Sequence, residues 1–360
     1  MTPPPGDGPT WPALIRALIG GQALSADQTA WAMNEIMDGA ASAAQIAGFG
    51  VGLRAKGETT EEMSGLAAGM LAHATPIAIP GPVTDLVGSG GDGAHTVNVS
   101  TMATIVAAAA GARMVKHGNR AASSACGAAD VLEALGVVID LPPAATEELF
   151  AELGIAFLFA PLYHPALRHA GPVRSQLGVP TAFNYLGPLT NPARPDSLAA
   201  GVADPLMGPV LAGVLAERGN SAIVCHGEGL DELTTTGPSM VWIVADGTVW
   251  PAEFDSASIG LPRGSLADLR GGDAARNAGV ARSVLSGEPG PVRDIVLLNA
   301  AAGLAAAAGL GQVTSADALT KALADGLARA AEAVDSGAAG RLLANWAETS
   351  RRLATPGHRG

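Results

Sequence analysis

The chain has 360 residues, of which 48% are hydrophobic and 15% charged, and a formal net charge of −12. This length allows one large or two smaller domains, and the apolar content predicts a sizeable buried core. The acidic balance argues against a nucleic-acid surface, and no uninterrupted apolar run approaches the roughly 18 residues that a membrane-spanning helix needs. Any phosphate ligand must therefore be held by local donors, basic side chains or a metal ion, because the overall field opposes it.

The first ten residues, MTPPPGDGPT, are rich in Pro and Gly and predict a disordered tail. They lack the basic and apolar regions of a signal peptide. Two cysteines, Cys126 and Cys225, are too few for a disulfide framework and favour a reducing compartment. We therefore expect a cytoplasmic protein.

Residues 11–78 predict helices throughout. Three hydroxyl residues are each followed, three positions later, by Gln or Glu, which is the spacing of a capping box at a helix start. These pairs are Ser25 with Gln28, Ser42 with Gln45, and Thr59 with Glu62. Gly39 and Gly57 follow the first two apolar runs as stop signals. Nothing here indicates chemistry, and so small a helical layer often needs a partner surface, so we predict that it forms a dimer interface.

After residue 82 short apolar runs alternate with helical segments, which favours an α/β domain with a largely parallel sheet. The predicted strands are 83–87, 113–116, 155–159 and 222–225. In such a sheet, ligands bind at the carboxyl ends of the strands. Three polar motifs directly follow three of these runs, so we expect a binding site at that edge.

The first motif is GSGGDG at 88–93, ahead of a helix predicted for 99–110. A strand, a glycine-rich turn and a helix start place backbone N–H groups at the positive end of a helix dipole, which suits a phosphate. Glycine allows close approach and positive φ. A tight connection without a ligand explains such a turn about equally well. The loop has neither the Walker nor the dinucleotide-binding spacing.

The second motif is KHGNR at 116–120, and the third is HGEGLDE at 226–232. Two cations, an imidazole and a carboxamide suit a pyrophosphate or a carboxylate, although a solvated surface loop is the plainer alternative. The adjacent Asp231 and Glu232 need a neutralising partner if they are held close together. Carboxylates on a loop suit Mg²⁺, while an acidic surface turn is the plainer alternative.

Five motifs, in this order and spacing, resemble the anthranilate phosphoribosyltransferase family. They are GSGGD (88–92), NVST (98–101), KHGNR (116–120), FNYLGPLTNPARP (183–195) and GLDELTTTGP (229–238). The resemblance continues to GGDAARNA (271–278) and GPVRDIVLLNAAAGL (290–304), and thus covers nearly the whole chain. It implies Mg²⁺-dependent transfer of the phosphoribosyl group of phosphoribosyl pyrophosphate (PRPP) to the amine of anthranilate. This reaction is the second step of tryptophan biosynthesis from chorismate.

The resemblance also implies the residues of the site. Those for PRPP are Gly88, Ser89, Gly90, Gly91, Asp92, Thr96, Asn98, Ser100, Thr101, Lys116, Asn119, Ser123 and Ser124. Those for anthranilate are Gly88, His117, Asn119, Ala160, Pro161, His164, Arg174, Gly187 and Pro188. Ser100, Asp231 and Glu232 are the implied ligands of two Mg²⁺ ions. His117, Asn119 and Arg174 are the implied catalytic residues, and Arg174 binds the carboxylate of anthranilate.

The implied fold is that of the nucleoside phosphorylase-like phosphoribosyltransferases. It has a small helical domain, 11–78 with a segment near 174–195, and a large α/β domain, 79–173 and 196–355. The implied assembly is a homodimer through the helical domain. This sequence departs from the family pattern at Ser89, where Thr is common, and at Cys126 and Ala128, which replace two serines of a phosphate-binding loop.

Two alternatives remain open. A pyrimidine nucleoside phosphorylase has a related fold and a similar KHGNR loop, but it does not need Arg174 or the FNYLGPLTNP stretch. A non-catalytic nucleic-acid-binding relative requires a basic groove and lost metal ligands, whereas this chain is acidic and keeps Asp231 and Glu232. The sequence does not identify the group that accepts the amine proton, for which His117 is only a candidate. It assigns no role to His95.

Overall fold

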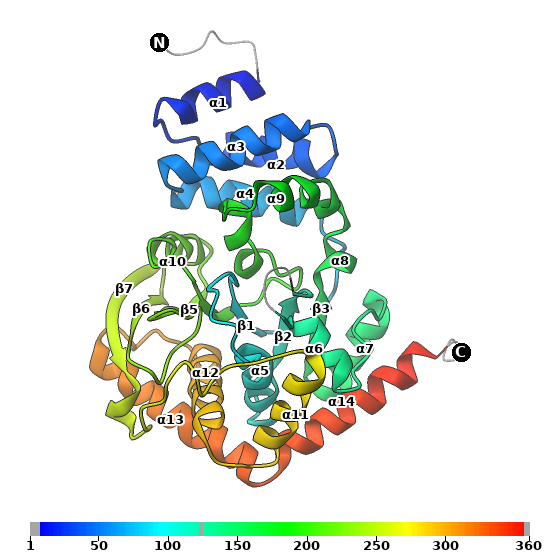
Figure 1. The fold of residues 1–360 in the computed structure, drawn as a ribbon, viewed down its shortest axis with the longest axis vertical. Helices are drawn as coiled ribbons and strands as arrows, with labels where there is room; N and C mark the ends of the chain where they lie inside the picture. The colour runs from blue at the N-terminus through cyan, green and yellow to red at the C-terminus, as the bar shows by residue number, and fades with distance from the viewer. Residues whose placement is uncertain (1–7, 122–124, 356–360) are drawn as a thin grey trace.

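A helical layer lies at one end of the molecule and an α/β part at the other (Figure 1). The computed structural model describes residues 8–121 and 125–355. The helical layer is built from α1 (Trp11–Ile19), α2 (Ala26–Met37), α3 (Ala43–Lys56) and α4 (Thr60–Ala72), with α9 (Gly171–Leu177) against α3. Most of the predicted tail, 1–7, and the two serines predicted to bind PRPP, Ser123 and Ser124, lie outside the described residues.

All three predicted capping boxes start helices, namely α2, α3 and α4. In each box the side chain of the first residue accepts the N–H of the third helical residue, whose own side chain accepts the first N–H in return, which satisfies two otherwise unpaired donors. Gly57 ends α3 with φ +89°, and Gly39, with φ +72°, follows α2. The helix boundaries in this layer therefore follow directly from local sequence.

The α/β part contains a seven-stranded sheet of order β3-β2-β1-β4-β5-β6-β7. The strands are β1 (Thr84–Gly88), β2 (Met114–Gly118), β3 (Ile155–Phe159), β4 (Ser197–Gly201), β5 (Ser221–Gly227), β6 (Pro238–Ala245) and β7 (Thr248–Asp255). The first five in chain order are parallel, and β6 and β7 extend the sheet as an antiparallel hairpin. The predicted class, a helical bundle with a largely parallel α/β sheet, is confirmed. Strands β4, β6 and β7 were not predicted from the sequence.

Helices cover both faces of the sheet. On one face α5 (Val99–Ala109) packs against α12 (Pro291–Ala308), and both contact β1. On the other face α10 (Met207–Glu217) lies between β5 and α4, so the core of the helical layer continues into the sheet. The remaining helices are α6 (Ala128–Ala134), α7 (Pro143–Leu153), α8 (Ala160–Tyr163), α11 (Ala274–Leu285), α13 (Ala316–Asp335) and α14 (Ala338–Ala354). The 3₁₀ turns are η1 (Pro165–His169), η2 (Ala182–Tyr185), η3 (Gly187–Leu189) and η4 (Ser256–Ile259).

Helix α12 is the only described helix whose length and composition would allow it to cross a membrane. It has 18 residues, and 67% of it is buried inside the protein, where it packs on α5, α13 and β4. Its first turn carries Arg293 and Asp294. Its apolar character therefore follows from its place at the centre of the core.

Candidate active site

The glycine loop follows β1 and is anchored on two sides. Ser89 donates its N–H to the carbonyl of Gly201 at 2.9 Å, and its Oγ accepts the N–H of Ala203 at 3.0 Å. The N–H of Gly90 donates to Oδ2 of Asp231 at 2.6 Å. Gly90 and Gly91 have φ of +70° and +85°, as the sequence predicted for this turn. The loop is thus fixed to the end of β4 and to the loop that carries the acidic pair.

Close approach explains why two strand ends carry glycine. A Cβ on Gly88 would lie 2.2 Å from Oδ2 of Asp231, and a Cβ on Gly201 would lie 1.7 Å from the carbonyl oxygen of Asp231. No side chain can be accommodated at either separation. Glycine at the ends of β1 and β4 therefore lets the Asp231 loop lie directly across the carboxyl ends of the sheet.

The far side of the glycine loop is held by a segment much later in the chain. Thr96 forms a β-bridge with Arg270. Oδ1 of Asn98 accepts Nδ2 of Asn277 at 2.9 Å, and Nδ2 of Asn98 donates to the carbonyl of Cys126 at 3.0 Å. Asn277 was not predicted as a site residue, although it lies in the GGDAARNA motif. Its role is to fix the side chain of Asn98 at the start of α5.

Lys116 is buried at the centre of these motifs. Its Nζ donates to the carbonyl of Leu86 and, at 3.1 Å, to Oγ of Ser100, so it joins β1, β2 and the first turn of α5. Burial lowers the pKa of Lys116, and the charges of Asp85, Glu232 and Asp231 oppose that shift. The cation therefore faces three carboxylates at the edge of the sheet where the phosphate is expected.

The acidic pair is also buried. Burial and the nearby charge of Asp92 raise the pKa of Asp231 to about 7. Burial and the charge of Asp231 raise the pKa of Glu232 well above its usual range, and Lys116 only partly offsets this. Two desolvated carboxylates side by side are costly to ionise together, so the pair is suited to a multivalent cation.

Within residues 8–121 and 125–355, no group of three or more His, Cys, Asp and Glu side chains could hold a metal ion unaided. Mg²⁺ commonly binds one or two protein carboxylates together with substrate phosphates. The buried Asp231 and Glu232 beside an N–H-lined loop match that pattern. The residues present therefore fit an Mg²⁺ ion that arrives with a phosphate-bearing ligand.

Two neutral histidines lie beside this cluster. The rings of His117 and His164 are 5.2 Å apart between centroids. Nε2 of His164 lies 2.7 Å from the carbonyl oxygen of Thr190, and Nδ1 of His117 lies 3.4 Å from the carbonyl oxygen of Gly187. Because a carbonyl oxygen only accepts, each of these ring nitrogens carries the hydrogen. The other nitrogen of each ring is buried without a partner among the described residues. Burial, reinforced by His164, lowers the pKa of His117 to about 3, so its Nε2 presents a lone pair.

Asp85 and Asn191 position His117 and were not predicted. Asp85 is fully buried, and burial raises its pKa to about 6. Its carboxylate accepts Nδ2 of Asn191 at 2.8 Å and the N–H of His117 at 3.4 Å. Nδ2 of Asn191 also donates to the carbonyl of Val115 at 2.8 Å. The available sequence signals were a carboxylate inside the buried strand β1 and the Asn of the GPLTNP stretch.

Among the described residues, the side chains of Arg174 and Asn119, which were also predicted for the site, form no hydrogen bond or ion pair with this cluster. The guanidinium of Arg174 lies 5.8 Å from the ring centroid of Phe183 and has no hydrogen-bonding or ionic partner in the described chain. Burial lowers its pKa. Oδ1 of Asn119 accepts the N–H of Arg120 within its own loop. Ala160 is buried at the start of α8, whereas the neighbouring Pro161 is exposed.

One part of the donor cluster inferred from KHGNR is wrong. The guanidinium of Arg120 pairs with Asp130 and Glu133 on α6 and lies over the ring of Phe159. It therefore does not add a second free cation to Lys116. Acidic residues ten and thirteen positions away neutralise it, which the five-residue motif alone does not reveal.

Comparison with known proteins decides the family. Residues 80–340 match the glycosyl transferase family, a/b domain, and residues 12–74 match its helical bundle domain. An anthranilate phosphoribosyltransferase of Thermobifida fusca is 60% identical over 346 residues, covering 96% of this chain and 98% of the relative. The chain belongs to the anthranilate phosphoribosyltransferase family.

Solved structures agree with this assignment. A crystal structure of anthranilate phosphoribosyltransferase from Thermus thermophilus is 41% identical, with a TM-score of 0.86, and covers 94% of this chain and 99% of its own. The enzyme from Saccharomyces cerevisiae in complex with PRPP and Mg is 26% identical, with a TM-score of 0.83, and covers 95% of this chain and 98% of its own. The family resemblance inferred from the motifs is thus confirmed.

In a member of this family, Gly90→Val is expected to weaken PRPP binding at least about tenfold and to leave anthranilate binding nearly unchanged. The φ of +70° costs a branched residue about 1–3 kcal/mol, and straining the turn displaces its N–H groups. Isothermal titration with each substrate measures the two affinities.

Gly21→Val is the matched control, because Gly21 also has φ +70° with no atom within 4 Å of an added Cβ, but lies after α1. An equal loss of PRPP affinity in both variants would show that backbone strain, and not a lost phosphate cradle, explains the effect.

Proposed function

We propose that this chain transfers the phosphoribosyl group of PRPP to the amine of anthranilate, giving N-(5-phosphoribosyl)anthranilate and pyrophosphate. The observation that carries the proposal is the convergence of the glycine loop, Lys116 and the acidic pair at the carboxyl ends of β1, β2 and β5. Such an arrangement suits a pyrophosphate with its divalent cation. The near full-length similarity to anthranilate phosphoribosyltransferases supports the second substrate.

The reaction breaks the bond between the anomeric carbon and pyrophosphate. Positive charge develops on the ribose ring, while the leaving pyrophosphate gains negative charge that the protein must stabilise. Lys116 and the N–H groups of the glycine loop supply donors for that charge, and they are already oriented by their contacts with Ser100 and Asp231. When bound at Asp231 and Glu232, Mg²⁺ would supply further charge neutralisation at the same oxygens.

His117 orients the amine in this proposal and is not its strong base. Its Nε2 lone pair can accept a hydrogen bond from an aromatic amine, which is already neutral near pH 7. With a pKa of about 3 in the substrate-free protein, the imidazole is a weak proton acceptor. Alignment of the amine with the anomeric carbon is therefore the expected contribution of His117.

Several finer features are part of the proposal. They are two Mg²⁺ ions, a homodimer through the helical layer, a cytoplasmic location, and the assignment of PRPP and anthranilate contacts to the residues predicted above. The proposed helical domain spans 11–78 and a segment near 174–195, and the α/β domain spans 79–173 and 196–355. The packing of α9 and η2 against α3 supports the return of the chain to the helical layer.

The proposal is tested by following anthranilate fluorescence with the purified protein, PRPP and Mg²⁺, omitting each component in turn. We expect turnover only when all are present. A parallel incubation with thymidine and inorganic phosphate tests nucleoside phosphorolysis, and cleavage there without anthranilate consumption would replace the proposal with the phosphorylase activity.

Arg174→Ala is expected to raise the KM for anthranilate about 30- to 150-fold and to leave the KM for PRPP within about twofold. A charged hydrogen bond to the carboxylate is worth about 2–3 kcal/mol, and the unpaired planar guanidinium over Phe183 suits an aromatic acid. Steady-state kinetics with each substrate varied measure the effect.

Arg174→Lys keeps the charge without the planar donor fork. Its KM for anthranilate should therefore fall between those of the wild type and Arg174→Ala. Arg168→Ala removes an exposed arginine on η1 that bonds only to the carbonyl of Pro165, and it should match wild type. Wild-type kinetics in Arg174→Ala would mean that the aromatic carboxylate binds elsewhere.

A further inference from the structure

A cavity lies on the helical side of the sheet. It has a volume of about 520 Å³ and is enclosed by α4, the 187–196 segment and the C-terminal end of α10. Its floor is apolar, formed by side chains such as Leu71, Leu198 and Leu215. A concave, mostly apolar cavity with a few polar groups is typical of a small-molecule site, and this volume lies in the usual range of about 300–1,000 Å³.

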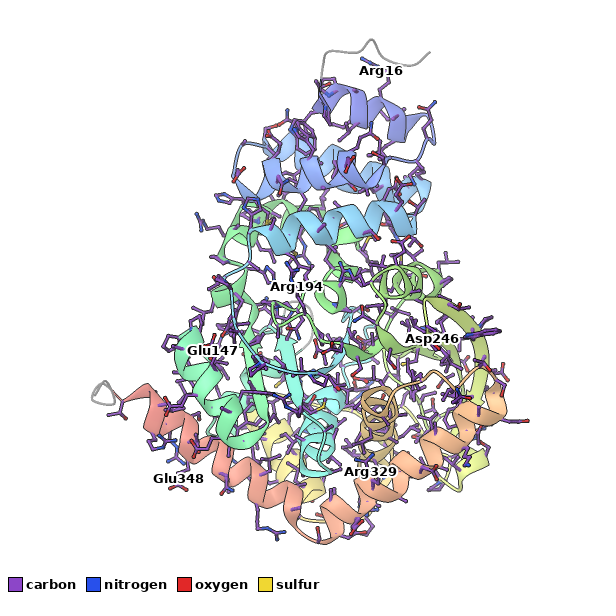
Figure 2. All side chains as sticks on the ribbon, turned by 180° about the vertical axis from the view of Figure 1, so that it is seen from behind. Arg16, Glu147, Arg194, Asp246, Arg329 and Glu348 are labelled. Atoms are coloured by element: carbon purple, nitrogen blue, oxygen red, sulfur yellow. The ribbon has the colours of Figure 1, made fainter. Side chains whose placement is uncertain are left out.

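Two arginines line this cavity. Arg218 donates Nη1 to the carbonyl of Leu189 at 2.7 Å, and neither Arg218 nor Arg194 forms an ion pair in the described chain. Burial and repulsion from Arg194 lower the pKa of Arg218, while Glu217 partly offsets the shift. Figure 2, seen from behind relative to Figure 1, labels Arg194 between the helical layer and the sheet. Both residues are exposed, so two guanidinium groups without an ion-pair partner lie at the rim of a cavity that also has apolar lining, which suits an anion with an apolar body.

The acidic groups nearby do not neutralise these arginines. The carboxylate of Asp196, which also lines the cavity, accepts the N–H of Val83 at 3.0 Å. The carboxylate of Glu217 accepts the hydroxyl of Ser64 at 2.7 Å. Neither carboxylate lies within ion-pair distance of Arg194 or Arg218. The two arginines are therefore free of ion pairs in the described chain, and Asp196 adds one negative charge to the same lining.

The cavity is separate from the proposed catalytic edge. Asp196 precedes β4, and Asn220 precedes β5, so the cavity opens at the amino ends of these parallel strands. Asp231 and Gly201 lie at the carboxyl ends. A five-residue strand rises about 3.3 Å per residue, so the two ends are roughly 15 Å apart.

One segment contacts both sites. Pro188 and Asn191 line the cavity, while the adjacent Gly187 accepts Nδ1 of His117 and Asn191 donates to Asp85. Thr190 accepts Nε2 of His164 at 2.7 Å. Pro188 was predicted as a wall of the anthranilate site, yet it also lines this cavity. A ligand that shifts this segment must therefore move the partners of both histidines.

We propose that the cavity between α4, the 187–196 segment and α10 binds a small carboxylate with an apolar body, held by Arg194 and Arg218. Occupancy alters the affinity of the aromatic-acid site through Gly187–Asn191. The binding of the carboxylate is independent of the proposed function. The linkage, meaning the effect of that binding on the affinity of the aromatic-acid site, rests on the proposed function.

Binding is tested by calorimetric titration of hexanoate into the full-length protein without substrates. We expect one site per chain, at least tenfold weaker in Arg194→Asn and in Arg218→Gln, and no comparable binding of hexylammonium. Asn suits the φ of +50° at position 194. Arg341→Gln is the matched control, because Arg341 also donates to a backbone carbonyl but lies on α14.

The remaining titrations can overturn the site. Hexanoate binding that is lost in Arg174→Ala would place the ligand in the proposed aromatic-acid site. Unchanged hexanoate binding in Arg194→Asn would show that the arginines do not bind the carboxylate. Inorganic phosphate that binds as tightly, with the same sensitivity to Arg194→Asn, would mean that the apolar floor has no part in recognition.

The linkage has its own readout. Saturating hexanoate is expected to change the KM for anthranilate at least twofold in wild type and not in Arg194→Asn. If hexanoate binds but the KM for anthranilate is unchanged, the linkage is refuted and the binding site in the cavity is retained. If no anthranilate is consumed under any condition, the proposed function fails, while the titrations still decide the site.

Discussion

Asp231→Asn and Glu232→Gln are each expected to lower kcat/KM for PRPP on the order of 10³-fold. The two carboxylates are buried side by side. Each substitution removes one negative charge that would otherwise bind a divalent cation. Loss of one well-oriented electrostatic group at a reacting centre commonly costs about 10²–10³ in rate. Initial rates measured across a range of Mg²⁺ concentrations give the effect.

The stability of these variants separates catalysis from folding. Because the folded-state pKa of each carboxyl lies above its unfolded value, the wild type loses stability as pH rises from the unfolded value toward the folded one. Asp231→Asn and Glu232→Gln remove that loss, so their melting temperatures at pH 8 without substrate should equal or exceed wild type.

Glu228→Gln serves as the matched control, since Glu228 is an exposed carboxylate in the same loop. It should retain wild-type rates. Full activity of the Asp231 and Glu232 variants at limiting Mg²⁺ would refute the assignment of the pair to the metal.

Lys116→Met is expected to reduce kcat/KM for PRPP about 10²- to 10³-fold, with the affinity for anthranilate within about twofold of wild type. Its Nζ is buried and donates to the carbonyl of Leu86 and to Oγ of Ser100, so Met leaves both acceptors without this donor. Its loss also raises the pKa of Asp85 further, because Lys116 lowers that pKa in the wild type. Calorimetric titration with PRPP and with anthranilate distinguishes the two affinities.

Lys321→Met on α13 controls for loss of a lysine, because Lys321 is exposed and distant along the chain. Lys116→Arg is not expected to restore activity, since the longer, branched guanidinium does not fit a site built around one ammonium. PRPP affinity close to wild type in Lys116→Met would exclude Lys116 from pyrophosphate binding.

Local signals predicted most of the fold because they act within a few residues. The capping boxes of α2, α3 and α4 and the apolar runs of β1, β2, β3 and β5 belong to this class. Strand β4 was missed because SLAAG has no β-branched or aromatic residue. It is a strand because β1 and β5 pair with it on both sides. The β6–β7 hairpin was overlooked, although Asp246-Gly247, both with positive φ, is a dipeptide typical of a two-residue hairpin turn.

The parts of the site that follow parallel strands could be predicted from the sequence. Parallel strands end at one edge, so the motifs after β1, β2 and β5 had to meet there. Asn277 and Asp85 were not predicted, because their roles depend on partners 179 and 106 positions away. Contacts across such separations depend on tertiary packing, which no local pattern encodes.

The bridge between Thr96 and Arg270, and the bond between Asn98 and Asn277, have a consequence for biosynthesis of the chain. Translation proceeds from the N-terminus, so the glycine loop leaves the ribosome long before the residues that hold its far side. The glycine loop, our proposed phosphate cradle, can form these contacts only after residues up to 277 have emerged. A nascent chain stalled before residue 270 lacks both contacts, and it also lacks α12, which packs on β1 and β4, so we expect its glycine loop to bind PRPP only weakly.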